Sequence, residues 1–395
     1  MMRTMRTMSI ISLVLAGSLI TATASGDRTT APSFAPDCSI ITATNTDQCV
    51  RMNEIQVLGT HNSYHVAPEP AMLTRLGERG RNIDYTHRPL TEQLSRLGIR
   101  QFELDVFADP DGGRYAKPAA LRMIPGLAPP GRELTAPGLK VLHGPDVDFR
   151  TTCPTFKACL REIKDWSKKN PWHVPIQIQI EAKDAPPSDP ESIGYVTPLP
   201  FDVDQLRTID AEIREVFDSA HVITPDVVRG SHETLGAAVA ADGWPLLRDA
   251  RGRIIFALDN TESHRLAYLN GNPTLEGRML FVSSPPGDPS AAFLKMNGAL
   301  GDEEARIREH VKRGFLIRTR ADIPTEEARS GSTVRRDSAF RSGAHYVSTD
   351  YPEPSPFGSG YIARLPGAER LPARCNPVNA PRGCRHEWLE PVPSK

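Results

Sequence analysis

Short apolar, β-branched runs alternate with helical patterns along most of this chain, and this alternation restricts the possible folds more than any other feature. Eight runs read as strands: Glu54–Leu58, Gln101–Phe107, Lys140–Leu142, Pro175–Glu181, Arg253–Leu258, Met279–Val282, Gly314–Ile317 and His345–Thr349. Helical patterns cover Leu90–Leu97, Thr155–Lys169, Val203–Ala220, Glu303–Lys312 and Thr325–Phe340. Strands joined through helices need crossover connections, so the pattern predicts a parallel sheet.

Eight parallel strands favour an α/β fold in which the sheet closes into a (β/α)8 TIM barrel, which we expect to be distorted. The alternative is an open, doubly wound sheet, although no GxGxxG motif follows the first strand. We expect the barrel to span residues 54–351. Residues 108–138 are rich in Gly and Pro and predict a long inserted loop, and the Pro-rich residues 352–395 predict a tail packed on the barrel.

The N-terminus has the layout of a secretory signal peptide. Arg3 and Arg6 precede the apolar run Ser9–Ile20, and the small-x-small sequence Ala22-Thr23-Ala24 follows. We therefore predict a signal peptide over residues 1–24, an N-terminal segment over 25–53, and a secreted protein. The alternative is a membrane anchor, but this run is shorter than the roughly 20 residues that a transmembrane helix needs. No later stretch predicts a transmembrane span.

The cysteines are consistent with export. They form three close pairs in the sequence: Cys38 and Cys49, Cys153 and Cys159, Cys375 and Cys384. Spacing alone does not determine the connectivity, and we predict the local pairs, because each would close a short loop in an oxidising compartment. The alternative is free buried thiols. Zinc is disfavoured because no CxxC pair is present.

The overall charge argues against a nucleic-acid partner. Lys plus Arg total 47 and Asp plus Glu total 48, so the formal net charge is -1. Nucleic-acid-binding proteins usually carry a basic patch or stripe. We expect a monomer.

Charged and imidazole side chains lie where four of the predicted strands end. His61 and Asn62 follow the first strand, and Glu103 and Asp105 end the second. His143 follows the third and Glu181 ends the fourth. Because the active site of a barrel lies at the C-terminal ends of its strands, we expect these side chains to converge there.

The acidic residues predict a cation site. Glu103 and Asp105 are two positions apart on a strand and therefore point to one face. Two buried like charges are costly unless a cation neutralises them. Glu181 would add a third carboxylate and Asn62 an amide oxygen. Oxygen ligands suit a hard cation, Ca²⁺ first and Mg²⁺ second. The alternative is that Glu103 and Asp105 pair with Arg side chains in a polar layer of the barrel.

His61 and His143 are the candidate proton-transfer pair. Imidazole can accept and imidazolium can donate a proton near pH 7. Two such groups beside a cation suit phosphodiester cleavage, in which one deprotonates the nucleophile and the other protonates the leaving oxygen. We interpret His65, His87, His173 and His386 as structural.

Four motifs resemble the X-region of phosphoinositide-specific phospholipases C. They are Thr60-His61-Asn62-Ser63-Tyr64, Phe102-Glu103-Leu104-Asp105, Leu142-His143-Gly144 and Ile178-Gln179-Ile180-Glu181. The sequence is most similar to the secreted, calcium-dependent bacterial branch. The resemblance covers about residues 54–184 and extends more weakly to about 351.

The resemblance implies a distorted TIM barrel that visits a membrane or micelle surface and cleaves phosphatidylinositol. The inositol 2-hydroxyl would attack phosphorus, diacylglycerol would leave, and an inositol cyclic phosphate would form. By position, His61 would be the general base and His143 would stabilise the transition state. Asn62, Glu103, Asp105 and Glu181 would hold Ca²⁺.

Substrate contacts are also implied by this resemblance. Arg318 falls on an arginine that contacts the inositol ring, and Arg320 replaces a tyrosine. Both share one face of a strand and could bind inositol hydroxyls or phosphate, although pairing with Asp322 or Asp350 is the alternative. Lys183 could contact the phosphate.

The position of Asp259 bears on the head group. Ala257 and Asp259 stand where eukaryotic relatives carry two lysines for ring phosphates. This difference predicts a preference for unphosphorylated phosphatidylinositol.

The inserted loop offers apolar side chains at Leu121, Met123, Ile124 and Leu127. They could touch the lipid interface, or the loop could pack over the barrel.

Two other functions remain open at this point. Glycerophosphodiester phosphodiesterases share the barrel, a Glu-x-Asp pair and a later His-Gly, but usually begin with His-Arg-Gly where this chain has His61-Asn62-Ser63. The non-enzymatic alternative is a secreted inositol-lipid-binding protein that has lost turnover.

Overall fold

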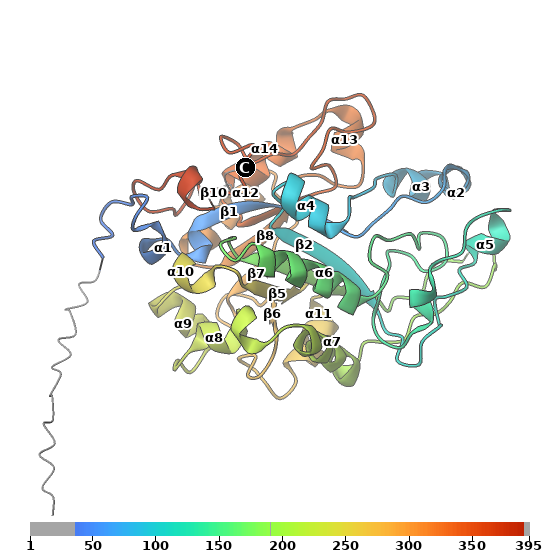
Figure 1. Cartoon of the computed structure of the whole chain (residues 1–395), viewed down its shortest axis with the longest axis horizontal. Helices are drawn as coiled ribbons and strands as arrows, with labels where there is room; N and C mark the ends of the chain where they lie inside the picture. The colour runs from blue at the N-terminus through green and yellow to red at the C-terminus, as the bar shows by residue number, and fades with distance from the viewer. Residues whose placement is uncertain (1–35, 190, 391–395) are drawn as a thin grey trace, which may run out of the picture. The chain divides into compact units, whose positions relative to one another are not determined.

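Eight parallel strands form a nearly closed barrel within residues 36–189 and 191–390, which the computed structural model describes (Figure 1). They are β1 (Ile55–Thr60), β2 (Gln101–Phe107), β4 (Ile176–Ala182), β5 (Ile254–Leu258), β6 (Leu280–Val282), β7 (Phe293–Lys295), β8 (Leu316–Arg320) and β9 (Tyr346–Thr349). Their order is β6-β5-β4-β2-β1-β9-β8-β7, and a parallel bridge from Ser283 to Phe293 brings the two ends together. The predicted TIM-barrel fold is confirmed.

Helices surround the strands and cover their apolar outer faces (Figure 1). The longer ones are α6 (Phe156–Lys169), α7 (Val203–Val216), α11 (Glu262–Leu269), α12 (Asp302–Lys312) and α14 (Val334–Arg341), and α4 (Leu90–Arg96) has seven residues. Shorter helices are α1 (Thr46–Cys49), α2 (Pro70–Leu76), α3 (Glu78–Asn82), α5 (Ala120–Met123), α8 (Pro225–Arg229), α9 (Leu235–Ala241), α10 (Leu247–Ala250) and α13 (Glu326–Ser330). Single 3₁₀ turns are η1 (Met52–Glu54), η2 (Arg132–Thr135), η3 (Ser219–His221) and η4 (His386–Trp388).

Helix α6 illustrates how the sequence determines an outer helix. The Thr155 hydroxyl accepts a hydrogen bond from the Ala158 N–H at 3.3 Å and caps the first turn. Phe156, Leu160 and Ile163 recur at helical spacing, and all three are fully buried against the barrel.

The assignment of the third barrel strand was wrong. Lys140–Val141 forms β3, which pairs antiparallel with β2 and lies outside the barrel. The insertion before it holds short helical turns, and an antiparallel return needs a loop and no crossover helix. The eighth barrel strand is instead β7, a three-residue strand that the sequence analysis did not identify.

The helix predicted over Thr325–Phe340 is divided into α13 and α14. Gly331 ends α13 with φ of 74°, in the left-handed region that stops a helix.

The C-terminal residues add a further strand to the barrel. β10 (Ala373–Cys375) pairs antiparallel with β1, the first barrel strand. Farther along, Glu390 forms a buried ion pair with Arg100, just before β2. The end of the described chain therefore contacts the N-terminal side of the strands, away from the ends where the site lies.

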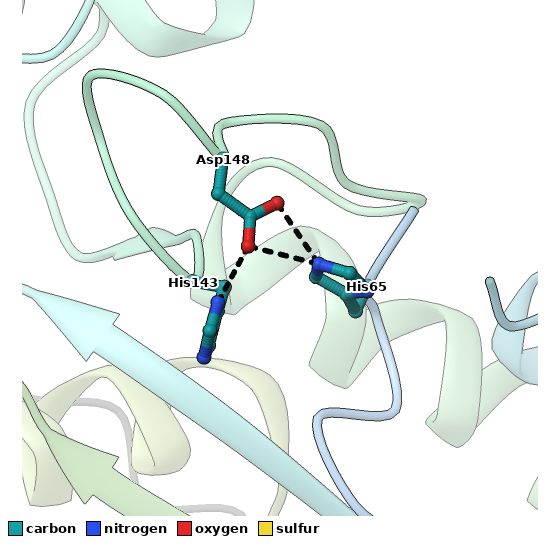
Figure 2. Close-up of side chains that lie close together, drawn as sticks. All are labelled: His65, His143 and Asp148. Atoms are coloured by element: carbon teal, nitrogen blue, oxygen red, sulfur yellow. Dashed lines mark hydrogen bonds and ion pairs between the residues drawn. The ribbon is translucent and has the colours of Figure 1, made fainter. Parts of the chain in front are cut away.

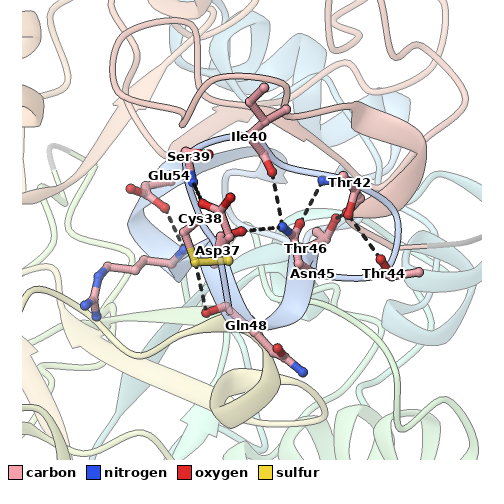
Figure 3. The surroundings of a disulfide bond; sticks show 12 residues. Asp37, Cys38, Ser39, Ile40, Thr42, Thr44, Asn45, Thr46, Gln48 and Glu54 are labelled. Carbon is pink, nitrogen blue, oxygen red and sulfur yellow. Dashed lines mark hydrogen bonds between the residues drawn. A yellow bond between two sulfur atoms is a disulfide. The ribbon is translucent and has the colours of Figure 1, made fainter. Parts of the chain in front are cut away.

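The three local disulfide pairings are confirmed: Cys38–Cys49, Cys153–Cys159 and Cys375–Cys384. Figure 3 shows the first disulfide, which closes the loop between Cys38 and Cys49, and Asn45 forms hydrogen bonds across this loop. The Asn45 amide donates to the carbonyls of Asp37 at 2.9 Å and Ile40 at 3.1 Å. The signal peptide predicted for residues 1–24 lies outside the described residues.

The insertion of residues 108–138 packs on itself and on neighbouring loops. Met72, Phe107, Tyr115, Leu134 and Phe149 belong to a separate apolar cluster there. Met123, Ile124 and Leu127 are half-buried against this cluster, which is the packing role left open by the sequence. Among the described residues, no helix is long and apolar enough to cross a membrane.

Candidate active site

The register of the parallel strands places the predicted polar residues on the inner face of the barrel. Glu103 lies beside Gln179, Asp105 beside Glu181, and Lys295 beside Arg318. Arg318 of β8 forms an ion pair with Glu103 of β2, although these strands are not neighbours in the sheet. That contact crosses the barrel interior, so the inner layer at the C-terminal ends of the strands is charged and not apolar.

His61 follows β1 and is held by two charged residues. Its Nδ1 donates to Oδ1 of Asp350 at 2.8 Å, and its Nε2 accepts from Nη1 of Arg320 at 3.2 Å. Arg320 Nη2 also donates to the second Asp350 oxygen at 3.0 Å. Burial and the Arg320 charge lower the pKa of His61 to about 3, against the opposing effect of Asp350. His61 is therefore neutral at pH 7, with an Nε2 that carries no hydrogen.

Three carboxylates converge next to His61. One oxygen each of Glu103, Asp105 and Glu181 lies within 4.8 Å of the other two. Burial raises the pKa of Asp105, and the nearby Glu181 charge adds to that rise against Lys183. Burial also raises the pKa of Glu103, against the effect of Arg318. Holding these acids ionised costs free energy unless positive charge compensates them.

Asn62, the fourth predicted ligand, directly follows His61, and its amide oxygen is buried. Its φ of 43° turns the chain sharply after His61, in a conformation that Asn tolerates better than most residues. Ser63 fixes the turn to β2, because its N–H donates to the Glu103 carbonyl at 2.9 Å and its Oγ accepts from the Glu103 N–H at 2.8 Å. The Asn62 amide nitrogen donates to Tyr85 at 2.9 Å.

The donor set fits a hard divalent cation. Oδ1 of Asn62 and both carboxylate oxygens of Asp105 are buried without a hydrogen-bond partner among the described residues. Buried oxygens rarely remain without a partner, and all the converging ligands are oxygens. Lys183 partly compensates the charge, with its Nζ 3.4 Å from Asp105 and 3.2 Å from Glu181.

His143 reaches the same region from the loop after β3. Its Nδ1 donates to Oδ2 of Asp148 at 2.6 Å. His143, Asp148, Glu181 and Lys183 line one cavity of about 560 Å³. Other walls of this cavity are apolar, with Ile83, Phe107, Val147 and Val196 among them. The second imidazole and Glu181, one of the three converging carboxylates, therefore face one space.

Arg318 and Arg320 pair with acids, as the alternative considered from the sequence allowed. Arg318 contacts Glu103 and Asn297, and Arg320 contacts Asp350. Arg320 lies 4.0 Å from Asp322. Both guanidinium groups nevertheless lie on the inner face beside His61 and Glu103.

Three further residues of this region were not predicted as site residues, although the sequence had offered Asp350 as a partner for Arg318 or Arg320. Asp350 directly follows the predicted strand His345–Thr349, so its position at a strand end was a usable signal. Lys295, which lies 2.6 Å from Asp259, sits on the short strand that was missed. Asp148 lies in the loop after β3, and no sequence pattern marked it.

The sequence matches the model of one family over most of its length. This family is described as "Phosphoinositide phospholipase C, Ca2+-dependent", and the match covers residues 50–377. The chain belongs to this family. It is therefore a phospholipase C, an enzyme that cleaves a phosphodiester bond of an inositol lipid, as the four motifs predicted. Comparison with curated proteins finds no match.

Solved structures of calcium-dependent phosphoinositol-specific phospholipase C from a Gram-negative Pseudomonas sp. have the same fold. One apo form aligns at TM-score 0.51 and 16% identity over 85% of this chain and 98% of that chain. A second crystal form aligns at TM-score 0.51 and 15% identity over 86% of this chain and 99% of that chain. At these identities the likeness bears on the fold alone.

Proposed function

We propose that this enzyme cleaves phosphatidylinositol with calcium bound by Asn62, Glu103, Asp105 and Glu181. The observation that carries the proposal is the convergence of the three carboxylates beside His61, together with buried oxygens of Asn62 and Asp105 that have no hydrogen-bond partner among the described residues. Magnesium is the second candidate, since it also prefers oxygen ligands. Bound calcium would stabilise negative charge at phosphorus and lower the pKa of the attacking hydroxyl.

The two histidines would move the protons. His61 Nε2 would accept the proton of the inositol 2-hydroxyl as it attacks phosphorus, while Asp350 holds the Nδ1–H and stabilises the imidazolium that forms. His143 would face the leaving group from the other side and donate a proton to the glycerol oxygen. The products would be diacylglycerol and an inositol cyclic phosphate.

Lys183, Arg318 and Arg320 would contact the phosphate and the inositol ring. Lys183 and Arg318 lie against Asp105 and Glu103, so both could shift toward a phosphate when these carboxylates coordinate a cation. This arrangement couples cation binding to substrate binding.

The head group would be unphosphorylated phosphatidylinositol. Asp259 pairs with Lys295 and accepts from Gln179 inside the barrel. The charges of Lys183, Lys295, Arg318 and Arg320 are each matched by a site carboxylate. Extra ring phosphates would therefore meet no excess of positive charge.

Export would place the enzyme where it meets lipid from outside the cell that makes it. The three disulfides and the leader-like residues 1–24 support a secreted enzyme. The enzyme would act as a monomer at a membrane or micelle surface.

One assay tests the proposal directly. Phosphorus NMR of a phosphatidylinositol digest should show inositol cyclic phosphate with calcium and no product after chelation, and magnesium should restore little. Folded His61→Ala protein should be inactive. Turnover of glycerophosphoinositol with intact phosphatidylinositol left uncleaved would instead indicate a glycerophosphodiesterase. Binding of the lipid without turnover in any divalent cation would indicate a binding protein.

A further inference from the structure

We propose that His65 is a positioning residue for His143 and acts through the carboxylate of Asp148, which the two imidazoles share. The inference deepens the proposed function and rests on it, because it takes His143 as the proton donor of that reaction. The sequence had suggested a purely structural role for His65.

The three side chains form one hydrogen-bonded chain, shown in Figure 2. Nε2 of His65 lies 2.9 Å from Oδ1 and 3.1 Å from Oδ2 of Asp148. Nδ1 of His143 lies 2.6 Å from the same Oδ2. Asp148 thus lies between two imidazoles, one fully buried and one that lines the catalytic cavity.

The partners of His65 fix the direction of its hydrogen bonds. Its Nδ1 lies 3.0 Å from the backbone carbonyl of Tyr85, which can only accept. Burial raises the pKa of Asp148, but the two imidazoles outweigh burial and bring it to about 2, so the carboxylate is ionised and also accepts. Both ring nitrogens of His65 therefore face acceptors, and the ring is held between the Tyr85 carbonyl and the Asp148 carboxylate.

This arrangement sets the state of His143. Because Asp148 accepts from the Nδ1–H of His143, the Nε2 of that ring is the nitrogen left to exchange a proton in the cavity. Nε2 of His65 contacts both oxygens of Asp148, and this bifurcated contact holds the carboxylate plane in place. Without His65, Asp148 would be a buried anion with a single side-chain donor. Its carboxylate would then be free to rotate away from His143.

The short loop between the two partners supports the same role. The N–H of Gly144 donates to the Asp148 carbonyl at 3.0 Å, and the Asp148 N–H donates to the Gly144 carbonyl at 2.8 Å. This closed loop brings Asp148 back beside His143. The backbone of this loop sets the position of Asp148 beside His143, and His65 sets the orientation of its carboxylate.

Two substitutions of His65 separate the positioning role from a structural one. In His65→Gln the amide nitrogen stands near the former Nε2 and can still donate to Asp148. In His65→Asn it stands near the former Nδ1 and can donate only to the Tyr85 carbonyl. A structural role predicts that Asn preserves activity at least as well as Gln.

Kinetics on phosphatidylinositol should show the opposite order. We expect His65→Asn to lower kcat about ten- to hundredfold, the usual effect of losing a group that orients an active-site histidine, with KM little changed. His65→Gln should lose several-fold less. With a nitrophenyl inositol phosphate, whose leaving group needs no proton, the deficit of His65→Asn should largely disappear. Equal losses in the two variants, or the same deficit on both substrates, would overturn the proposal.

A spectroscopic measurement without substrate keeps this test independent of the proposed function. Nitrogen-15 NMR of the histidine rings at pH 7.5 should show hydrogen on Nδ1 of His143 in the wild type and in His65→Gln. In His65→Asn that tautomer should be lost. Retention of the tautomer in His65→Asn contradicts the positioning role even if the enzyme is active, and its loss supports the role even if phosphatidylinositol is not the substrate.

Wild-type protein provides the remaining check, which no folding defect can affect. The same three groups are close enough to ligate a transition metal. Metal analysis of purified protein should find no stoichiometric zinc. Stoichiometric zinc bound by His65, His143 and Asp148 would overturn the proposal.

Discussion

His61 and Asp350 lie 289 positions apart in the sequence, and the imidazole Nδ1 of one donates to the carboxylate Oδ1 of the other at 2.8 Å. β1 and β9 are hydrogen-bonded neighbours in the barrel, so the residues that follow them emerge side by side. The carboxylate fixes the tautomer of His61, which leaves Nε2 free of hydrogen and directed at Arg320 and Glu103.

The pairing predicts the effect of Asp350→Asn. An amide can present its NH₂ group to Nδ1 and stabilise the wrong tautomer, so we expect kcat to fall by about 10²–10⁴-fold with KM less affected. Steady-state kinetics on phosphatidylinositol micelles measures the effect. Asp242→Asn, at an exposed carboxylate that contacts His232, is the matched control and should leave kcat unchanged. Full activity in Asp350→Asn would remove Asp350 from the mechanism.

The acidic cluster predicts calcium binding that calorimetry can detect. Glu181→Gln removes one charged ligand from a site with three carboxylates, and we expect calcium affinity to fall at least about tenfold. Glu309→Gln, at an exposed position of α12, should bind as the wild type does. Equal affinities in all three proteins would place calcium elsewhere.

Calcium should also stabilise the wild-type fold. A ligand that binds only the folded state at about 100 times its Kd adds about 2.7 kcal/mol to the free energy of unfolding. Thermal melting of wild type and Glu181→Gln, with calcium and with chelator, measures this gain. The gain should be smaller in the variant at the same calcium concentration.

The paired cations predict head-group selectivity. Phosphatidylinositol in mixed micelles should be turned over at least about tenfold faster than the bisphosphate lipid at equal surface concentration, because Lys295 is bound to Asp259 at 2.6 Å. Asp259→Asn removes the charged partner of Lys295 and should reduce the ratio of phosphatidylinositol turnover to bisphosphate-lipid turnover. Comparable turnover of the two lipids by the wild type would contradict the assignment.

His345 predicts a loss of stability in mild acid. Its Nδ1 accepts from the Ile317 N–H at 3.0 Å and its Nε2 donates to the Asn53 carbonyl at 2.7 Å, so the buried ring must be neutral. Burial lowers its pKa from 6.5 to about 4, against the hydrogen bond to Asn53. As pH falls, the unfolded chain binds a proton at this histidine before the folded chain does. The contribution of neutral His345 to the free energy of unfolding is therefore complete above pH 6.5 and is lost as pH falls toward 4.

The pKa shift of His345 alone corresponds to a loss of about 3 kcal/mol in the free energy of unfolding. Urea unfolding at several pH values between 7.5 and 4.5 measures it. In His345→Gln the free energy of unfolding should be lower at neutral pH and should depend less on pH. An identical pH slope in wild type and variant would show that another group titrates.

Much of the fold was readable because its signals are local. The alternation of strand and helix patterns predicted the barrel, and Thr155 marked the start of α6 as an N-cap. The error at Lys140–Val141 has a different origin, because an antiparallel edge strand and a parallel barrel strand of this length have the same composition. Phe293–Lys295 was not identified from its sequence, and its pairing with β8 gives it an extended conformation.

The sequence by itself predicted the barrel and determined the chemical types at the strand ends, because period and residue type are properties of the chain, and it favoured the local disulfides without fixing their connectivity. The tertiary structure decided which groups act on which. Strand order placed Asp350 against His61 and Lys295 against Asp259, and the folding of two loops placed His65 and Asp148 behind His143. Those contacts join residues far apart in the chain, and hydrogen-bond geometry, which sets tautomers and charge balance, exists only once the backbone is folded.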